Sequence, residues 1–550
     1  MFYLLLLIST LSSLLFFLPQ PLEKPLKQGL FLFYFFAYIF AYRSRKKTPQ
    51  YRTKIYQILN QVPNQIFIVT CVTISLFAFG WHYTQLTKAF AETLLFHDAD
   101  YIGMQEVVRS LLRGDGFYSS YYSSNGNGSY LSHHFAPALI LFLPFELLPV
   151  GRWGYAIGIY FYFCLGVILW TRLFLQKQSG SDQTKPSSSE NNFDIGYLLF
   201  VCMLSNIFIY RLATSYHFEI LVFPLSAIFF GYYENWKDSQ EKKNFYIFMP
   251  TVLSLLLLLM VKEDIGIYML LYFFPALLLS RGKNVILNII SALIAIYLMI
   301  AIFIIPTMYG EAESIGWMNE LSKEYPNDLK KVTGIGKSFS IFISILVAGG
   351  LAGVTDILAF LGLALVYLTH ALSTRPWHHE VYAYYSYTIV SFLLYAGLLW
   401  RKKRQLIPVW ACMIVLTLVM YLNVKDTNYP LSSSTIRSEG NLGVEMNAVV
   451  SELELIKKLL QDDFINNPSP NCEMPVIFSQ FNLSFFMPKE AKLKPLKVIN
   501  LKEARESQSY LVIAPKITID RYLTSETILS FRPYGKSLLF KGNWIEVWKL

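Results

Sequence analysis

Charged residues are scarce in this chain of 550 residues. Asp, Glu, Lys and Arg account for 15% of the sequence, whereas 54% is hydrophobic and 16% is aromatic. An average soluble domain carries about 25% charged residues. Apolar runs recur at the length of about 20 residues that a helix needs to cross a bilayer. The composition therefore predicts a polytopic α-helical membrane protein.

Cysteine is also rare, and its distribution argues against two kinds of site. Four of the five cysteines fall inside apolar runs, and only Cys472 lies in a polar region. The sequence contains no CxxC pair, so it offers neither a disulfide framework nor a cysteine-based zinc site. Much of the net charge of +10 lies in short loops between apolar runs. There it indicates membrane topology, and we expect no nucleic-acid partner.

The N-terminal region lacks the marks of a cleaved signal peptide, because no basic stretch or small-residue cleavage site flanks its apolar run. Residues 3–19 are interpreted as a retained span that pairs with 29–42. The block at 43–54 is strongly basic, and the positive-inside rule places it in the cytoplasm. The next span, 64–82, then delivers a first outer loop, 83–133, to the opposite side.

Ten further candidate spans follow. They are 154–175, 195–211, 214–233, 246–261, 265–280, 284–307, 339–354, 356–371, 385–400 and 406–423. The basic stretches RGKN at 281–284 and RKKR at 401–404 mark cytoplasmic turns. Residues 134–150 contain three prolines, which disfavour a regular helix, and are interpreted as re-entrant. The chain thus has about 13–14 predicted membrane segments.

Three parts of the chain differ in character. Residues 1–63 form a predicted helical hairpin with its basic cytoplasmic loop, and 64–423 form the transmembrane domain. Residues 424–550 contain no candidate span. Their helical pattern at 446–464 is followed by short β-like runs, at 474–480, 496–501, 509–515 and 543–550. This pattern predicts a small C-terminal α/β domain on the outer face, long enough to bury its own core.

Four clusters of ionisable residues interrupt the apolar pattern, and all four face the outer side in this topology. An ionised group in the hydrocarbon region costs about 2.5–3.5 kcal/mol, so such groups persist where a site needs them. The clusters are His97, Asp98 and Asp100; His133 and His134; Arg211, His217 and Glu219; and Lys262, Glu263 and Asp264. We expect members of these clusters to line one outward cavity.

Each cluster also has a structural interpretation. The acids of the first cluster could be solvated loop residues, and the two adjacent histidines could cap an interfacial segment. His217 and Glu219 could form a hydrogen-bonded pair. Asp264 lies where its side chain is expected to cap the following helix. The stretch RPWHHEVYAYYSY at 375–387 is interpreted as an aromatic belt at the membrane interface rather than as a metal site.

The order of these motifs resembles a bacterial and archaeal membrane-protein family called domain of unknown function 2079. The resemblance extends over about residues 64–550. Its motifs are ADYIGMQEVV at 99–108, GDGFYSS at 114–120, HFAP at 134–137, YHFE at 216–219, KED at 262–264, HHEVYAYYSY at 378–387 and GNWIEVWKL at 542–550. Phe218 stands where the family's F-H-P-E pattern has proline.

That family looks related to the GT-C glycosyltransferases, which take sugars from polyprenyl-phosphate carriers outside the cytoplasmic membrane. In that superfamily the first outer loop carries one or two essential acids, followed by helices that lie along the membrane. Asp98 and Asp100, followed by the amphipathic segment 101–113, match this plan. The resemblance implies a GT-C-like fold, a multi-pass location in the cell membrane and transfer of a sugar to an envelope glycan, lipid or protein.

Glycosyl transfer from a lipid phosphate needs a base for the acceptor hydroxyl and positive charge near the departing phosphate. Asp100 is the predicted base or metal ligand, with Asp98 as its partner. Lys262, Arg211 or a bound divalent cation, Mg²⁺ or Mn²⁺, would stabilise the phosphate. The remaining residues predicted to line the substrate pocket are His134, His217, Glu219, Glu263 and Asp264. No metal-ligand set is specified by the sequence.

Two other functional classes remain open at this stage. Charged groups inside a membrane also mark translocation routes, so the chain could be a transporter or flippase of a lipid-linked or small polar substrate. The sequence shows no internal repeat, although transporters often have one. The chain could also be a non-catalytic scaffold that assists envelope assembly through its outer domain.

Overall fold

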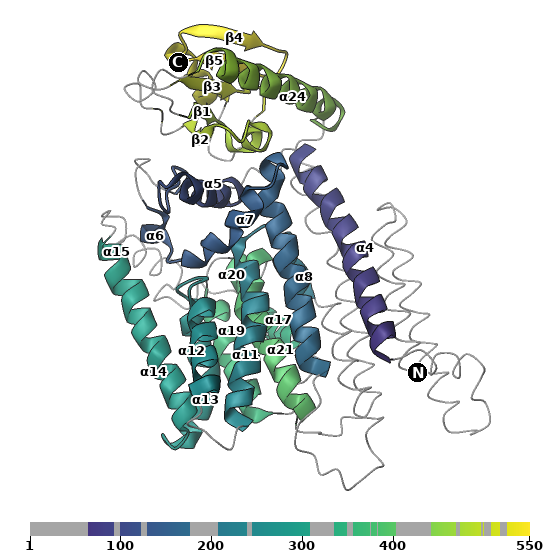
Figure 1. Ribbon diagram of the computed structural model, residues 1–550, viewed down its shortest axis with the longest axis vertical. Coiled ribbons are helices and arrows are strands. Elements are labelled where there is room, and N and C mark those ends of the chain that lie inside the picture. Colours follow the sequence, from purple (N-terminus) through teal and green to yellow (C-terminus); the bar gives the residue numbers. More distant parts are fainter. Residues whose placement is uncertain are drawn as a thin grey trace, which may run out of the picture. The chain divides into compact units, whose positions relative to one another are not determined.

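The structure is a computed structural model of the chain, and its described residues form helices and one small sheet (Figure 1). The described residues are 64–92, 99–122, 129–175, 207–238, 245–308, 335–348, 356–373, 376–381, 383–402, 442–468, 474–496, 499, 508–517 and 525–550. The predicted hairpin at 1–63 and the span at 406–423 lie outside them.

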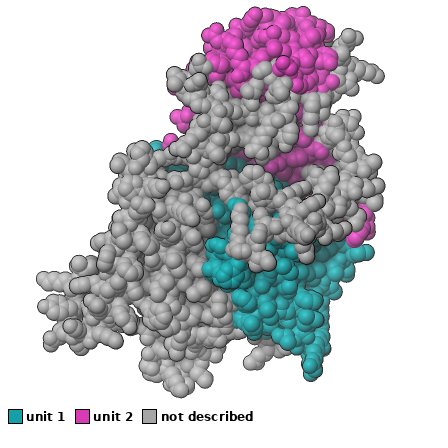
Figure 2. Space-filling view, turned by 180° about the vertical axis from the view of Figure 1, so that it is seen from behind, with its two compact units in different colours: residues 1–84, 160–299, 318–430 teal, residues 85–159, 300–317, 431–550 magenta. Residues whose placement is uncertain are grey.

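The chain divides into two compact units (Figure 2). The first, called the helical unit here, comprises Met1–Thr84, Tyr160–Met299 and Met318–Pro430. The second, called the mixed unit, comprises Gln85–Ile159, Ile300–Trp317 and Leu431–Leu550. The mixed unit therefore joins the predicted first outer loop and the C-terminal region, although several hundred residues separate them in sequence.

Helices make up the described part of the helical unit, and two of them, α4 and α8, extend across its boundary. They are α4 (Asn64–Glu92), α8 (Gly154–Leu175), α10 (Ile207–Thr214), η4 (Phe218–Leu221), α11 (Val222–Asp238), α12 (Phe245–Leu259), α13 (Ile265–Ser280), α14 (Val285–Met299), α17 (Ile335–Ala348), α19 (Ile357–Ala371), α20 (Pro376–His379), η7 (Ala383–Ser386) and α21 (Tyr387–Lys402). Helix α11 packs against α12 and α21, and α13 packs against α14 and α19.

Small residues allow these helices to approach closely, as in other membrane bundles. A Cβ atom at Gly166 of α8 would lie only 2.3 Å from the ring of Phe223 on α11. A Cβ atom at Gly362 of α19 would lie 2.4 Å from the main-chain oxygen of Tyr272 on α13. Larger side chains at these two positions would push the helices apart.

Two described helical stretches, Gly151–Phe174 and Val285–Ile304, are long and apolar enough to cross a membrane by length and composition. Five further apolar helices in the described part of the chain have 10–17 residues. The predicted spans 154–175 and 265–280 coincide with α8 and α13. The total of 13–14 membrane segments stays a prediction.

The mixed unit begins with α4's last residues and the amphipathic helix α5 (Ala99–Arg113). Four short elements follow: α6 (Tyr130–His133), η2 (Pro137–Phe142), α7 (Leu143–Glu146) and η3 (Gly151–Trp153). The prediction that 134–150 is not a regular helix is confirmed. A π-helical turn, η5 (Ile300–Ile304), and α15 (Ile305–Met308) also belong to this unit.

The C-terminal part of the mixed unit is a five-stranded sheet with helices. Its elements are α24 (Leu442–Asn466), β1 (Val476–Ser479), η8 (Phe481–Phe486), β2 (Lys492–Pro495), β3 (Ser509–Ile513), α26 (Ser525–Leu529), η10 (Arg532–Tyr534), β4 (Ser537–Lys541) and β5 (Glu546–Lys549). The strand order is β2-β1-β3-β5-β4. Strand β1 pairs in parallel with β2 and β3, whereas β5 pairs antiparallel with β3 and β4.

Apolar residues cover both faces of this sheet's centre, which is why β1 and β3 are buried at every position. Helix α24 contributes a buried stripe at helical spacing, namely Val449, Leu453, Ile456 and Leu460. A cluster that includes Phe478, Leu511 and Ile528 forms a second core. The predicted α/β character of the C-terminal region is therefore confirmed.

Three sequence-based boundaries differ from the structure. Strands β2 and β4 were not predicted, and the run predicted as a strand at 496–501 lies mostly outside the described residues. Helix α4 continues to Glu92, so the helix ends ten residues later than predicted. The predicted span 214–233 instead starts with a turn and the 3₁₀ helix η4. Both missed strands are outer strands of the sheet: β4 is largely exposed, and β2 alternates lysine with apolar residues, so neither has a continuous apolar run.

Candidate active site

Asp100 lies in the first turn of α5, where the helix dipole favours a negative charge. Its side chain is partly exposed. The hydroxyl of Tyr122 donates to the Asp100 carboxylate Oδ1 at 3.3 Å, and its oxygen lies equally far from the main-chain oxygen of that residue. A Cβ atom at Gly103 would lie 2.6 Å from the Tyr122 ring. Glycine at 103 thus lets Tyr122 reach Asp100 across the helix face.

Aromatic contacts in the mixed unit continue from Tyr122 to His134. The rings of Tyr122 and Tyr130 lie 4.8 Å apart, and those of Tyr130 and His134 lie 6.0 Å apart. Asp100 and His134 therefore stand at the two ends of one chain of contacts. Sequence reasoning missed Tyr122, although a glycine three residues after an acid on an amphipathic helix indicates close approach of another group.

Asp98 and His97 lie outside the described residues, and so does the side chain of His133. The predicted partnership between Asp98 and Asp100 stays a prediction. The convergence of Asp100 and His134 with the site residues of the helical unit also stays one.

In the helical unit, Glu219, Lys262 and His217 form one buried polar cluster. The Lys262 ammonium donates to Glu219 Oε1 at 3.1 Å. His217 Nδ1 lies 3.3 Å from Glu219 Oε2. All three side chains are less than a tenth exposed. Members of the third and fourth clusters of the sequence are therefore in contact, and the outward cavity that they were expected to line stays a prediction.

The chain reaches this arrangement through a sharp turn before η4. Tyr216 has φ +59°, a left-handed conformation that is unusual for a bulky residue. His217 precedes the helix in extended conformation, and Phe218 is its fully buried first residue. The first position of a helix also suits proline. Phenylalanine at 218 thus occupies a position that the family's proline would fit without changing the turn.

Two tyrosine rings enclose the Lys262 charge. Its Nζ lies 5.4 Å from the centroid of Tyr384 and 5.3 Å from that of Tyr387, within range of cation–π attraction. The Tyr384 ring also stacks on His217 with centroids 3.8 Å apart. One carboxylate and two aromatic faces therefore hold the ammonium group.

Asp264 does not cap α13 through its side chain, so that prediction is wrong. It occupies the N-cap position, yet its carboxylate makes no capping hydrogen bond. Instead, Oδ2 accepts a hydrogen bond from the hydroxyl of Tyr387. The hydrogen bond with Tyr387 thus replaces the bond that the carboxylate would make to the main-chain N–H groups at the start of α13. Its neighbour Glu263 is buried, whereas Asp264 is partly exposed.

Arg211 is more accessible than Lys262. It is only partly buried, and its Nη1 donates to the main-chain oxygen of Val381 at 3.4 Å. This contact ties α10 to the segment that carries Tyr384 and Tyr387. The Arg211 guanidinium also lies over the ring of Phe208, 5.7 Å from its centroid.

The described side chains of this stretch, at 378–381 and 384–387, are packed into the helical unit, which contradicts the predicted interfacial belt at these residues. His378, His379 and Tyr387 are each at most 4% exposed. His370 lies between the main-chain oxygen of His378, 2.9 Å from Nδ1, and the Thr388 hydroxyl, 2.8 Å from Nε2. These histidines stabilise the fold around the cluster through hydrogen bonds.

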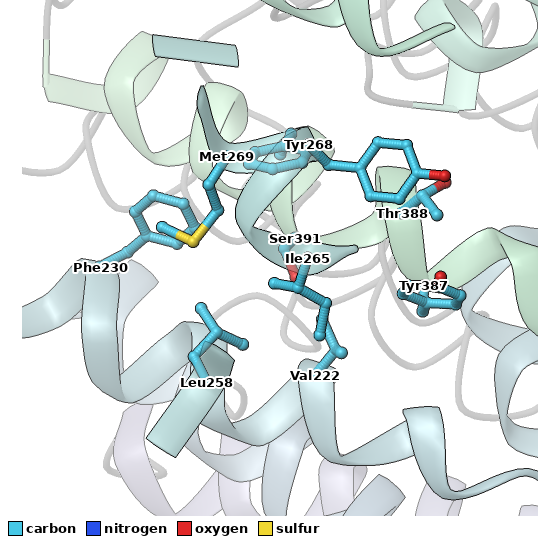
Figure 3. Close-up of a pocket in the computed structure, with 10 residues that line it drawn as sticks. Val222, Phe230, Leu258, Ile265, Tyr268, Met269, Tyr387, Thr388 and Ser391 are labelled. Atoms are coloured by element: carbon cyan, nitrogen blue, oxygen red, sulfur yellow. The ribbon is translucent and has the colours of Figure 1, made fainter. Parts of the chain in front are cut away.

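A small cavity lies beside Tyr387, one of the two tyrosines that contact Lys262 (Figure 3). Its lining is mostly apolar and includes Val222, Leu258, Met269 and Phe392, with Tyr387 at its edge. Its volume of about 10 Å³ is at the lower limit for one water molecule. This cavity is too small for a sugar, so it is not the predicted substrate pocket.

A buried charge network on α5 was not foreseen from the sequence. Glu106 pairs with Arg152 at 2.9 Å, Arg109 at 3.5 Å and Arg113 at 3.8 Å. Burial alone would raise the pKa of the Glu106 carboxyl, but these arginines more than offset it and hold the pKa below its ordinary value of 4.5. Charges spaced at 106, 109 and 113 on one helix were the available indication.

The described residues do not test the predicted divalent cation, because Asp98 lies outside them. Among the described residues, no three His, Cys, Asp or Glu side chains gather in a ligand-like group. The bound Mg²⁺ or Mn²⁺ therefore stays a prediction.

Comparison with known proteins completes this description. No curated protein matches the sequence. The crystal structure of ArnT from Cupriavidus metallidurans bound to undecaprenyl phosphate is similar, with a TM-score of 0.51 and 10% identity. The alignment covers 86% of this chain and 98% of that one. The apo form of the same ArnT gives a TM-score of 0.45 and 12% identity over the same shares of both chains.

The likeness to the lipid-bound ArnT shows a shared fold, and it agrees with the GT-C relation that the motifs imply. The family model named DUF2079, described as a predicted membrane protein, matches residues 94–463. The match includes all nine predicted site residues, whereas the tail motif at 542–550 lies beyond it. This chain therefore belongs to the DUF2079 family of membrane proteins.

Proposed function

We propose that this protein transfers a sugar from a polyprenyl-phosphate-linked donor to an envelope acceptor on the extracytoplasmic side of the membrane. The main support is a partly exposed acid, Asp100, at the start of an amphipathic helix that follows an apolar helix. The chain shares its fold with ArnT, which was solved with undecaprenyl phosphate bound. A polyprenyl phosphate is therefore the carrier that the proposal names.

Asp100 acts in this proposal as the general base. It takes the proton from an acceptor hydroxyl, whose oxygen attacks the anomeric carbon while the bond from that carbon to the phosphate oxygen breaks. Tyr122 holds the carboxylate in place through its hydrogen bond. Asp98 assists, and His134 lines the acceptor side.

The helical unit supplies the phosphate side of the proposed site. The leaving polyprenyl phosphate carries negative charge that a fixed cation stabilises. Arg211 is the better candidate, because its side chain is partly exposed, whereas Lys262 is buried between Glu219 and two tyrosine rings. Lys262, Glu219, Glu263 and His217 then shape the pocket wall, with Asp264 at its partly exposed edge. No step of the proposal passes through a metal ion.

Asp100→Asn tests the proposal directly, because it keeps the shape of the side chain and removes the base. General base catalysis typically contributes about 10²–10⁴-fold, so sugar transfer should fall by that factor in proteoliposomes supplied with a polyprenyl-phosphate sugar. Asp462→Asn is the matched control, since Asp462 is an exposed acid on helix α24. It should retain near-normal transfer.

The comparison needs both variants to be folded. Thermal stability should barely change in either, because substitutions of exposed residues usually stay within about 0.5 kcal/mol. Full transfer by a folded Asp100→Asn protein would remove Asp100 from the mechanism. Loss of folding in that variant would assign it a structural role instead. Loss of transfer on addition of a chelator would show that a divalent cation also takes part.

A further inference from the structure

We infer that Arg152 and Glu106 are positioning residues that fix helix α5, and with it Asp100, to the C-terminal sheet. The inference rests on the proposed function, because it concerns how the proposed base is held. It adds two residues and a role for the C-terminal domain that no motif of the chain indicated.

The Arg152 guanidinium binds two parts of the mixed unit at once. Toward α5, its Nη1 donates to Glu106 at 2.9 Å and to Gln105 Oε1 at 3.3 Å. Toward the C-terminal domain, Nε donates to the main-chain oxygen of Met487 at 3.1 Å and Nη2 to that of Pro488 at 3.3 Å. The side chain is 1% exposed. The rigid fork of arginine suits this double role, which lysine could not fill.

Glu106 makes the reciprocal connection from the other side. Its Oε1 pairs with Arg152, while Oε2 lies 3.5 Å from the main-chain N–H of Leu493 on β2. Nearby, the Ser120 hydroxyl lies 3.5 Å from the main-chain oxygen of the same Leu493. The carboxylate and the guanidinium therefore form one clasp between α5, η3 and the sheet.

Further contacts close the same interface around the clasp. The hydroxyls of Tyr121 and Ser484 lie 3.3 Å apart. At the exposed end of α5, Lys492 pairs with Asp115 at 3.3 Å. Gln105 donates to Glu146 at 2.9 Å and to the main-chain oxygen of Arg152 at 3.0 Å. Asp115, two residues after α5, and Tyr121 in the loop beyond it thus also contact the C-terminal domain.

This clasp bears on chemistry because of where Asp100 lies. Asp100 is six residues before Glu106 on the same continuous helix, about 9 Å along its axis at 1.5 Å per residue. A tilt of α5 about the clasp therefore displaces the carboxylate. A displacement of about 1 Å can reduce a rate by about 10²-fold when a catalytic group must meet its substrate in line.

The primary experiment compares hydrogen exchange in the full chain in nanodiscs for wild type, Arg152→Lys and Glu106→Gln. Peptides from α5 and from β1 to β2 should exchange about 10–100-fold faster in both variants, because a buried charged hydrogen bond is lost. Peptides from α13 and α21 should not change. Arg172→Lys is the control, because Arg172 is an exposed arginine on α8.

The kinetic arm separates positioning from mere folding support. With a polyprenyl-phosphate sugar as donor, kcat should fall by about 10–100-fold while KM for the donor stays near its wild-type value. Tyr121→Phe, which removes one hydroxyl from the same interface, should show the same split to a smaller degree. It also provides a test if the charge variants do not fold.

Unchanged exchange of α5 in the folded variants would overturn the inference. Faster exchange of α5 with an unchanged kcat would overturn it as well, since the helix would then move without consequence for the base. If the wild-type protein transfers no sugar while α5 still responds, the proposed function fails and the mechanical coupling stands.

Discussion

Among single residues, Lys262 poses the question whether its buried charge binds the substrate or stabilises the fold. Its partner Glu219 is 3.1 Å away, and both side chains are nearly inaccessible. Removing one member of a buried pair leaves the other charge uncompensated, which typically costs about 3–5 kcal/mol. Replacing both members with apolar groups is often close to neutral.

Lys262→Met should therefore lower the free energy of unfolding by about 3–5 kcal/mol, and adding Glu219→Leu should recover most of that loss. The measurement is thermal unfolding of the purified protein in detergent. Lys237→Met is the matched control, because Lys237 pairs with Glu234 at 3.2 Å but its side chain is 45% exposed. Such a pair is worth at most about 1 kcal/mol.

The double variant then decides the role of the pair. A stable double variant that has lost sugar transfer would place the pair in substrate binding. A stable double variant with normal transfer would make the pair structural, which was the alternative interpretation of this cluster.

The turn between β4 and β5 shows, at the scale of an element, how one carboxylate organises a hairpin. Glu452 of α24 accepts hydrogen bonds from three successive main-chain N–H groups, those of Asn543, Trp544 and Ile545, at 2.8–3.1 Å. A Cβ atom at Gly542 would lie 2.3 Å from the Glu452 carboxylate. The GNW sequence of the tail therefore allows α24 to bind the hairpin.

Glu452→Gln should destabilise the C-terminal domain by about 1–3 kcal/mol, because hydrogen bonds to a charged acceptor are lost from a tight turn. Gly542→Ala should have an effect of similar direction, since the new methyl group would collide with the carboxylate. Pulse proteolysis in increasing urea, with fragments from 442–550 followed, measures the change. Glu454→Gln is the control, because Glu454 is an exposed neighbour on α24. If Glu452→Gln proves as stable as Glu454→Gln, the Glu452 carboxylate does not stabilise the hairpin turn.

The interface between α5 and the sheet should depend on acidity. The folded pKa of Glu106 lies below its ordinary value of 4.5. The stabilisation is therefore complete above about pH 4.5 and is lost as the pH falls through the folded pKa. In the wild-type protein, cleavage within α5 by an acid-active protease should accelerate as the pH falls through the folded pKa of Glu106. Glu106→Gln should be cleaved readily at every pH, and a wild-type rate independent of pH would contradict the expectation.

The sidedness of the C-terminal domain is a prediction at the scale of the whole molecule. The basic block at 43–54 is expected in the cytoplasm by the positive-inside rule, which leaves 424–550 outside. Protease added to intact spheroplasts should cleave within 424–550 and spare 43–54. Antibodies against the two ends identify the fragments. Protection of the tail with cleavage of the basic block would invert the topology.

Local patterns predicted the regular elements well. Continuous apolar runs with clear ends located α8 and α13 to the residue, because their bounds are set by composition. The irregular structure of residues 134–150 was predicted from their three prolines. The edge strands β2 and β4 were missed, since β4 is largely exposed and β2 alternates lysine with apolar residues.

The candidate site was less predictable for a different reason. The sequence analysis selected acids and histidines in apolar surroundings as site residues, and of these Lys262 lies beside Glu219. However, the Asp264 carboxylate accepts a hydrogen bond from Tyr387, and Arg152 donates to a main-chain oxygen more than 300 residues away. Such partners are set by tertiary packing, and no local spacing in one sequence encodes them.

The position of Leu493 has a consequence for crowding in the membrane plane. Strand β2 is an outer strand of the sheet, and the open edge of a strand can template pairing with another chain. All copies of a membrane protein share one orientation in the bilayer. The same exposed strand edge therefore lies at the same height above the membrane in every copy, and such edges would meet often. Glu106 and Ser120 approach the edge atoms of Leu493 from within the same molecule. The contact that holds α5 thus also discourages strand-to-strand self-association.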